Sequence, residues 1–118
     1  MDEQMKLTNK ITLDLDKFSW EMVEAVAGEF IENTVDGELN EMRIYQSAGG
    51  EGYHIECEMN WWTTPEMQLL IREEFYDDPK RLKWSKIDLK QGFAWDVLFT
   101  FKKICGQWKK RKLIMTIE

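Results

Sequence analysis

The chain has 118 residues and a mass of 14.2 kDa, and we expect a single domain over residues 1–118. Hydrophobic residues make up 43% and charged residues 32%, a balance that excludes a disordered chain. No apolar run approaches the roughly 20 residues of a membrane span, and the first residues do not resemble a signal peptide. We therefore expect a cytoplasmic protein with no membrane partner. Two cysteines and one histidine exclude most zinc sites.

The net charge of −6 is divided unevenly along the chain. Residues 1–60 hold 14 acidic and 4 basic residues, a net charge of −10, whereas residues 61–118 hold 8 acidic and 12 basic residues, a net charge of +4. The overall acidity disfavours a protein that simply coats phosphates. An acidic half joined to a basic half fits either a metal-dependent enzyme that acts on nucleotides or a module that docks on a protein partner. Most of these charges are expected on a solvated surface.

The first third of the chain predicts a strand followed by a helix. Residues 5–16 end in alternating apolar and polar residues, which is the period-two pattern of a half-buried strand. Ser19 can cap a helix, because the apolar residues from Trp20 to Ile31 recur at helical spacing. The turn dipeptide Asp36-Gly37 ends this unit.

The middle of the chain predicts a hairpin and a second helix. Residues 41–47 and 53–59 are predicted strands, and the glycine-rich turn at 48–52 joins them. Residues 63–66 (TTPE) combine a hydroxyl cap, a first-turn proline and a glutamate three residues after Thr63, which is a strong helix start. This helix should stop at 77–79 (DDP), where the aspartates cap or solvate a helix end.

The rest of the chain predicts a basic, irregular segment over residues 80–92, followed by strands at 93–102 and 108–117. The element order βαββαβ plus one more strand is that of an α+β, ferredoxin-like or RRM-like sandwich. We therefore expect an antiparallel sheet with two helices on one face and an extra C-terminal strand. In this topology the first and third strands are central neighbours, the fourth flanks the first, and the other sheet face is open.

Polar residues occupy the outward positions of the predicted strands. They are Asp14 and Asp16 in the first strand, His54, Glu56 and Glu58 in the third, and Asp96 in the fourth. We expect these side chains to converge on the open face. Because Asp14 and Asp16 are two apart on a strand, their carboxylates point the same way and repel each other, and Mg²⁺ or Mn²⁺ would relieve that repulsion. The alternative is a solvated strand with two ordinary aspartates.

His54 follows a turn that contains Gly50 and Gly52. Glycines let backbone N–H groups approach a phosphate, and a nearby imidazole can bond the same anion. These three residues are therefore candidates for nucleotide binding. The alternative is a plain hairpin turn followed by a surface histidine.

The basic stretch from Lys80 to Lys86 contains Trp84. Lysine and arginine side chains can follow a nucleic-acid backbone, while an aromatic ring stacks on a base. Arg81 and Lys83 are therefore candidate phosphate-binding residues. The alternative interpretation, a plain surface loop, has equal weight.

Three short stretches resemble motifs of the archaeo-eukaryotic primase superfamily. Residues 11–16 (ITLDLD) resemble its first motif, Asp-hydrophobic-Asp after a hydrophobic run, with Thr12 as a departure. Residues 47–55 resemble its second motif, a glycine-rich hairpin leading to a histidine, although Gly52 stands where the family has serine. The third motif, a hydrophobic residue followed by an acid, fits Trp95-Asp96, with Ile87-Asp88 as the alternative.

This resemblance implies an RRM-like catalytic core for nucleotidyl transfer. It implies that Asp14, Asp16 and Asp96 (or Asp88 in its place) are catalytic ligands of Mg²⁺ or Mn²⁺, and that His54 contacts the phosphates of a nucleoside triphosphate. The expected function is that of a minimal primase-like or polymerase-like enzyme, or a relic of one, acting with DNA or RNA. The stretch from residue 72 to 88 also resembles small proteins of archaeal viruses and plasmids, which would place the protein in the cytoplasm of a host cell.

Two non-catalytic functions remain open. One is a nucleic-acid-binding module. The outward positions of the predicted central strands are acidic and not aromatic, which disfavours RNA binding by the sheet, although a register shifted by one residue would expose Tyr53. Binding through the basic C-terminal region would be a separate route. The other is a small acidic accessory protein of a virus or plasmid that docks on a protein partner.

Overall fold

The structure is a computed structural model of the chain, and it describes residues 7–91 and 101–118. The fold is α+β. Its elements in chain order are β1 (Thr8–Asp16), α1 (Trp20–Glu32), β2 (Leu39–Gln46), β3 (Gly52–Thr63), α2 (Pro65–Glu74), α3 (Pro79–Lys90), β4 (Phe101–Ile104), β5 (Gln107–Lys110) and β6 (Lys112–Ile117).

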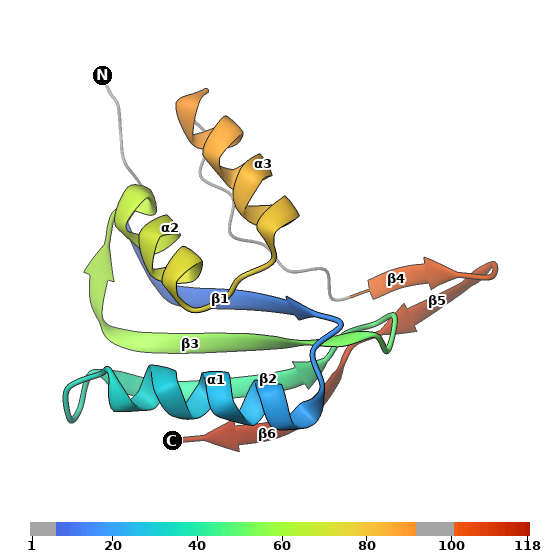
Figure 1. Cartoon of the computed structure of the whole chain (residues 1–118), viewed down its shortest axis with the longest axis horizontal. Coiled ribbons are helices and arrows are strands. Elements are labelled where there is room, and N and C mark those ends of the chain that lie inside the picture. The colour runs from blue at the N-terminus through green and yellow to red at the C-terminus, as the bar shows by residue number, and fades with distance from the viewer. Residues whose placement is uncertain (1–6, 92–100) are drawn as a thin grey trace.

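Four strands form an antiparallel sheet in the order β1-β3-β2-β6, and β4 and β5 form a separate hairpin (Figure 1). The prediction that the first and third strands are neighbours is confirmed. A ferredoxin-like order would place a later strand beside β1, but in the described part of the chain β6 pairs with β2 at the opposite edge. The predicted strand 93–102 lies mostly outside the described residues, and its last two residues belong to β4. The predicted C-terminal strand is present as β5 and β6, which Arg111 separates.

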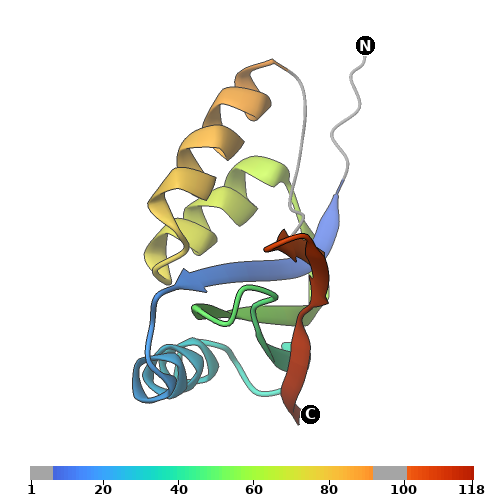
Figure 2. The same ribbon diagram turned by 90° about the vertical axis from the view of Figure 1, so that its right-hand side faces the viewer.

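The two expected helices are present. The helix α1 begins at the predicted cap, whereas the cap of α2 is Thr64, one residue after the Thr63 from which the capping glutamate was counted. Ser19 Oγ accepts the Met22 N–H at 3.3 Å at the start of α1, and Thr64 Oγ1 accepts the Met67 N–H at 3.3 Å at the start of α2. The described residues contain a third helix. Figure 2 shows the α2–α3 pair above β1, at one edge of the sheet, and α1 below β1. Because the buried side of α1 packs on the core residues of β1, β2 and β3, the sheet has a face covered by α1 and an opposite face.

The prediction of an irregular segment at 80–92 is wrong, because residues 79–90 form α3. Its start has the same chemistry as that of α2: Asp78 Oδ2 accepts the Arg81 N–H at 3.1 Å and Pro79 occupies the first turn. The helix was missed because Leu82 is its only buried residue, so the apolar spacing that marks an amphipathic helix is weak.

The core lies between the sheet and the helices α1 and α2. The alternating inward residues of β1, β2 and β3 are buried as predicted, together with one side of α1. The largest members are Ile11, Leu13, Leu15, Phe30, Met42, Ile44, Ile55 and Met59. Phe75, at the end of α2, joins this core with its ring 4.8 Å from that of Phe30. This contact ties the second helix to the first.

In the described part of the chain, side chains of the α2–α3 unit close the outer edge of β1 along its middle. An unpaired strand edge is a site for unwanted strand pairing. Three hydrogen bonds occupy it here: Gln68 Nε2 to Lys10 O at 3.2 Å, Arg81 Nη1 to Thr12 O at 3.1 Å, and Asp14 N–H to Asp77 Oδ1 at 2.7 Å. The α2–α3 unit thus covers the edge at which we expected the fourth strand.

Asp77 holds this unit together. Its carboxylate is buried, with Oδ2 at 2.9 Å from Arg72 Nε and Oδ1 at 2.8 Å from Arg81 Nη1. Arg72 is buried as well, and its Nη2 donates to Ser85 Oγ at 3.0 Å. The prediction that both aspartates cap or solvate a helix end is right for Asp78 and wrong for Asp77, which joins α2, α3 and β1.

Candidate functional site

The sheet face opposite the helices is polar, as the alternation predicted. Tyr53 turns toward α1, with its ring 5.6 Å from that of Trp20, so the next residue, His54, faces away from the helices. In the strand register His54 lies between Asp14 of β1 and Tyr45 of β2. The predicted convergence of the first and third strands is therefore seen for Asp14 and His54.

Asp14 is a half-buried acid beside the imidazole of His54. Its Oδ1 lies 3.7 Å from Nε2 of His54, which is an ion-pair distance and too long for a direct hydrogen bond. Burial raises the pKa of Asp14 to about 6, although the guanidinium of Arg81 opposes the shift. Three neighbouring carboxylates raise the pKa as well: those of Asp78, Asp77 and Asp16. Burial is therefore the main cause of the raised pKa, and the neighbouring carboxylates add to it.

His54 is buried although it faces away from the helices. Burial and the positive charges of Arg111 and Arg81 together lower its pKa to about 4, while Glu56 and Asp77 oppose this shift. At neutral pH the imidazole is uncharged and Asp14 carries the negative charge of the pair. A neutral imidazole can accept or donate one hydrogen bond but does not attract a phosphate electrostatically.

Arg111 covers this polar face and was not singled out from the sequence. It lies between β5 and β6, where its Nη1 donates to Glu56 Oε2 at 2.7 Å and lies 3.5 Å from Nδ1 of His54. Its guanidinium lies 3.8 Å from the centre of the Tyr45 ring. Arg111 stands within a run of basic residues, and no sequence pattern distinguishes it from its neighbours. Tyr45, the aromatic residue beside His54, is thus already in contact with a cation.

The glycine-rich turn is explained by its backbone geometry. Gly50 adopts a φ of +76°, and its N–H donates to Ser47 O at 2.9 Å, so this N–H already has a partner. Gly52 is buried against the end of β1, where an added Cβ would lie 2.6 Å from Leu15 O. Asp16 is exposed and pairs with Gly52 in the register. The glycine at position 52 thus allows the start of β3 to pack closely against the end of β1.

The predicted third metal ligand is not brought to this face. Asp96 lies outside the described residues, and Asp88 lies about 10 Å along α3 from Arg81, the residue of that helix that contacts β1. Within residues 7–91 and 101–118, no three His, Cys, Asp or Glu side chains are close enough together to hold a metal ion. Asp14 and Asp16 are the remaining carboxylates at the predicted position.

The two predicted phosphate-binding cations of the basic stretch differ in environment. The guanidinium of Arg81 bonds to Asp77 and to Thr12, and its side chain is only 13% exposed. Lys83 is exposed on the surface of α3. Arg81 therefore holds the fold of the β1 edge, whereas Lys83 is accessible to a ligand.

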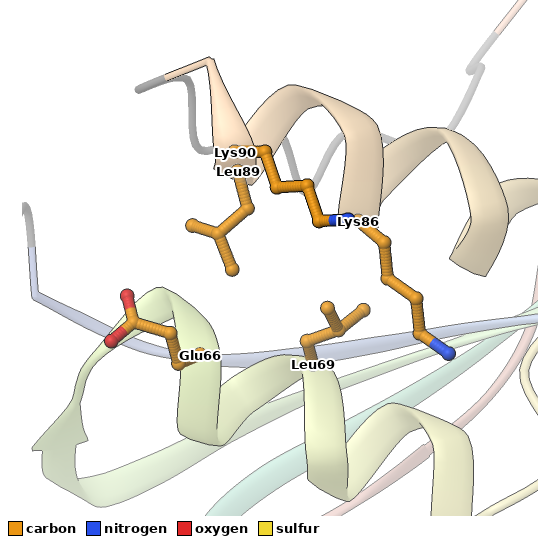
Figure 3. Close-up of a pocket in the computed structure, with 5 residues that line it drawn as sticks. All are labelled: Glu66, Leu69, Lys86, Leu89 and Lys90. Atoms are coloured by element: carbon orange, nitrogen blue, oxygen red, sulfur yellow. The ribbon is translucent and has the colours of Figure 1, made fainter.

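A shallow pocket of about 420 Å³ lies between the N-terminal half of α2 and the C-terminal half of α3 (Figure 3). Leu69 and Leu89 form its walls, and Glu66, Lys86 and Lys90 lie around them. Lys86 also pairs with Glu73 at 3.0 Å. The two helices diverge from their junction at Asp77, so the pocket opens far from His54.

The β4–β5 hairpin projects from the body of the protein (Figure 1). Its turn residues, Cys105 and Gly106, have φ values of +51° and +79°, which match a tight two-residue hairpin turn. Trp108 is 69% exposed, and Lys109 and Lys110 follow it on the same exposed strand. The hairpin thus presents an aromatic ring among positive charges.

No family model matches this chain, and neither a curated protein nor a solved structure is found that is similar to it. In the part of the chain that the structure describes, no helix is both long and apolar enough to cross a membrane.

Proposed function

We propose that this protein binds nucleic acid through the part of the chain from residue 80 to 112. This part contains eleven Lys and Arg residues and two Asp, a charge of +9 in a protein whose net charge is −6. The observation that carries the proposal is that six of these lysines are exposed on two elements outside the acidic α1–β2–β3 body. They are Lys80, Lys83, Lys86 and Lys90 on α3 and Lys109 and Lys110 on β5. Clustered positive charge of this kind attracts the phosphate backbone.

The hairpin is the stronger of the two elements as a binding surface. It is narrow and basic, and one strand carries an exposed tryptophan next to two lysines, Lys109 and Lys110. Lysines bind phosphates whatever the sequence, and an aromatic ring stacks on any base. Arg111 fixes the base of the hairpin to the sheet through Glu56. In this proposal the hairpin binds nucleic acid while the Arg111–Glu56 ion pair holds its base against the sheet.

The test is the salt dependence of binding to a labelled oligonucleotide. Replacing Lys109 and Lys110 by Gln should weaken binding and reduce the slope of log K against log salt by about 1.4 for a single strand. The matched control replaces two exposed lysines of the acidic half, Lys10 and Lys17, by Gln. The control should leave the slope unchanged. Equal effects of the two double variants would refute binding by the hairpin.

The second candidate function is nucleotide and divalent-metal binding at the open sheet face, which the primase resemblance implies. Its support is the position of Asp14, which is half-buried near the carboxylates of Asp78, Asp77 and Asp16. Burial raises the pKa of Asp14, these carboxylates raise it as well, and a bound cation would stabilise its charged form. Asp14 and Asp16 would hold Mg²⁺ or Mn²⁺ together with water and triphosphate oxygens, and Lys83 would be an accessible cation for the phosphates.

Calorimetric titration of Mn²⁺, with and without a nucleoside triphosphate, tests this second candidate. Heat of binding in the wild type that disappears in Asp14→Asn/Asp16→Asn, but persists in the exposed control Glu24→Gln/Asp36→Asn, would support it. Primer-synthesis assays would then separate an active enzyme from a relic. Absence of binding in the wild type would refute a metal site.

A further inference from the structure

One side of α3 is fixed to the rest of the protein. Leu82 on this side is buried, and Ser85 Oγ accepts a hydrogen bond from Arg72 Nη2 of α2 at 3.0 Å. Arg81 donates to the backbone oxygen of Thr12 in β1 at 3.1 Å. These contacts hold the helix in place before any ligand binds, so binding through its other side requires no ordering of the helix.

The other side of α3 is exposed and basic. The helix contains five Lys and Arg residues and a single acid, Asp88. At 3.6 residues per turn, four exposed residues lie on the side away from Leu82, which we call the exposed side of α3. They are Lys80, Lys83, Trp84 and Ile87. Asp88 lies at the border of this side.

The exposed side of α3 is a convex ridge. The twelve residues of α3 form a helix about 18 Å long. Figures 1 and 2 show α3 at the periphery of the molecule, with α2 as the helix beside it. The pocket between Leu69 and Leu89 lies on the side of α3 that faces α2, and not on this ridge. A ligand of the exposed side must therefore itself provide a concave surface that receives a helix.

We infer that the exposed side of α3 binds in the major groove of B-form duplex DNA. This inference rests on the proposed nucleic-acid binding and adds the class of ligand. The major groove is about 12 Å wide and about 8.5 Å deep, and it admits an α-helix with a diameter of about 10–12 Å. The phosphates that border the groove attract Lys80 and Lys83, whatever the base sequence.

The base edges in the groove provide partners for the other side chains of the ridge. Trp84 and Ile87 can make apolar contact with the C5-methyl group of thymine, and the carboxylate of Asp88 can accept a hydrogen bond from the N4 amino group of cytosine. These contacts carry sequence information, whereas the lysine contacts fix the position of the helix.

Three other ligands fit the exposed side of α3 less well. Proteins that bind single strands present a positively charged groove that follows the backbone, whereas α3 presents a ridge. The major groove of duplex RNA is deep and too narrow for side chains to read. A helix that lies on a membrane has a broad apolar face, whereas here two apolar side chains, Trp84 and Ile87, lie beside lysines. Shape and charge together therefore favour duplex DNA.

Fluorescence anisotropy with three labelled ligands tests the inference: a DNA duplex, the RNA duplex of the same sequence and one strand of the DNA. Lys80→Gln/Lys83→Gln should weaken binding to the DNA duplex by about tenfold and reduce the slope of log K against log salt by about 1.8. Losses on the other two ligands should be smaller, because the hairpin binds them without α3. The matched control Lys10→Gln/Lys17→Gln should leave all three affinities unchanged.

Methylation of the bound DNA duplex by dimethyl sulfate locates the groove. This reagent methylates guanine N7, which lies in the major groove, and adenine N3, which lies in the minor groove. The wild type should protect guanine N7 and leave adenine N3 reactive. Trp84→Ala should lose the protection of guanine N7, whereas Trp62→Ala should keep it, since Trp62 is 62% exposed but lies on β3, outside the basic part.

The outcomes separate this inference from the proposed function. Unchanged binding to the DNA duplex in Lys80→Gln/Lys83→Gln, together with a reduced salt slope in Lys109→Gln/Lys110→Gln, overturns the inference and leaves nucleic-acid binding by the hairpin in place. Equal losses on the three ligands, or protection of adenine N3 alone, also overturn it. If Lys80→Gln/Lys83→Gln loses binding to anionic lipid vesicles and not to DNA, the exposed side of α3 is assigned to a membrane surface instead. Circular dichroism of each variant checks that the fold is kept.

Discussion

At the scale of single residues, the structure depends on buried charges that the sequence does not reveal. Asp77 is enclosed by Arg72 and Arg81 and also accepts a backbone hydrogen bond from β1. Sequence patterns identify exposed caps and alternating strands, but they do not show which of two adjacent aspartates is buried. Asp77 and Asp78 have the same side chain but different environments. The path of the chain after α2 determines that Asp77 is buried and that Asp78 caps α3.

Replacing Asp77 by Asn should destabilise the fold strongly. The variant leaves two guanidinium groups in a buried site without their counter-charge, and breaking a buried ion pair in this way costs about 3–5 kcal/mol. The control is Asp78→Asn, which changes a helix cap and should cost at most about 1 kcal/mol. Urea unfolding followed by circular dichroism measures both. Similar losses in the two variants would contradict the network that we describe.

Asp14 and His54 should contribute opposite and nearly cancelling pH dependences to stability. The folded state lowers the pKa of His54 from 6.5 to about 4, so the stability that its neutral form provides is present above pH 6.5 and is lost as the pH falls to 4. The folded state raises the pKa of Asp14 from 3.8 to about 6, so its stability is present below pH 3.8 and is lost as the pH rises to 6.

Removing either Asp14 or His54 should reveal how the free energy of unfolding changes with pH through the other residue. Relative to wild type, Asp14→Asn should lose about 1.4 kcal/mol of stability per pH unit as the pH falls from 6 to 4, and His54→Gln should gain about as much over the same range. Urea unfolding at pH 4, 5 and 6 measures both slopes. Parallel curves for the two variants would show that these groups do not titrate with shifted pKa values.

At the scale of elements, the two edges of the sheet are protected in different ways. The middle of β1 is covered by side chains of the α2–α3 unit. β6 has a register shift, because Leu113 pairs with Tyr45 and Met115 with Ile44, which leaves Ile114 as an extra residue. Such a bulge bends an edge strand and discourages pairing with another chain. Apolar side chains exposed on β6 are therefore compatible with a chain that does not aggregate through this edge.

The turn of the β4–β5 hairpin offers a test at the same scale. Cys105 has a φ of +51°, a conformation that Asn adopts more readily than Cys. We expect Cys105→Asn to stabilise the hairpin by a few tenths of a kcal/mol, and Gly106→Ala to destabilise it by about 1 kcal/mol. Hydrogen exchange of the Ile104 and Gln107 amides reports on the hairpin alone. Slower exchange in Gly106→Ala than in wild type would contradict this turn geometry.

The elements that were read correctly from the sequence carry strong local signals. The alternation around Ile11 and Ile55, the Ser19 cap and the Thr64-Pro65 start each depend on nearby residues only, and each is present in the structure. The helix α3 was missed because a helix that buries one leucine has no apolar face to detect. The strand order could not be read from the chain, because it depends on which elements cover the β1 edge.

At the scale of the whole molecule, charge is separated into an acidic body and a basic extension. Residues outside 80–112 carry −15, against +9 within that part. The calculated isoelectric point of about 4.9 therefore gives a misleading picture of what the surface attracts. Local charge decides the binding of a polyanion, because salt screens distant charges within about 10 Å at 0.1 M.

This separation should be visible in chromatography. At pH 7 and low salt the protein should be retained on heparin despite its net negative charge, and it should elute as the salt concentration rises. The Lys109→Gln/Lys110→Gln variant should elute at lower salt than Lys10→Gln/Lys17→Gln. Flow-through of the wild type at low salt would show that the acidic body governs the interaction.

The contact of Arg111 with His54 allows changes at the base of the hairpin to be detected in the NMR signals of the histidine ring. The chain has a single histidine, so its ring protons give one resolvable pair of signals in a proton NMR spectrum. Because Arg111 joins the base of the hairpin to this ring, any ligand that shifts the hairpin also changes the ring's magnetic environment. If a ligand binds the hairpin, its binding can therefore be followed through the signals of His54, which is buried on the sheet.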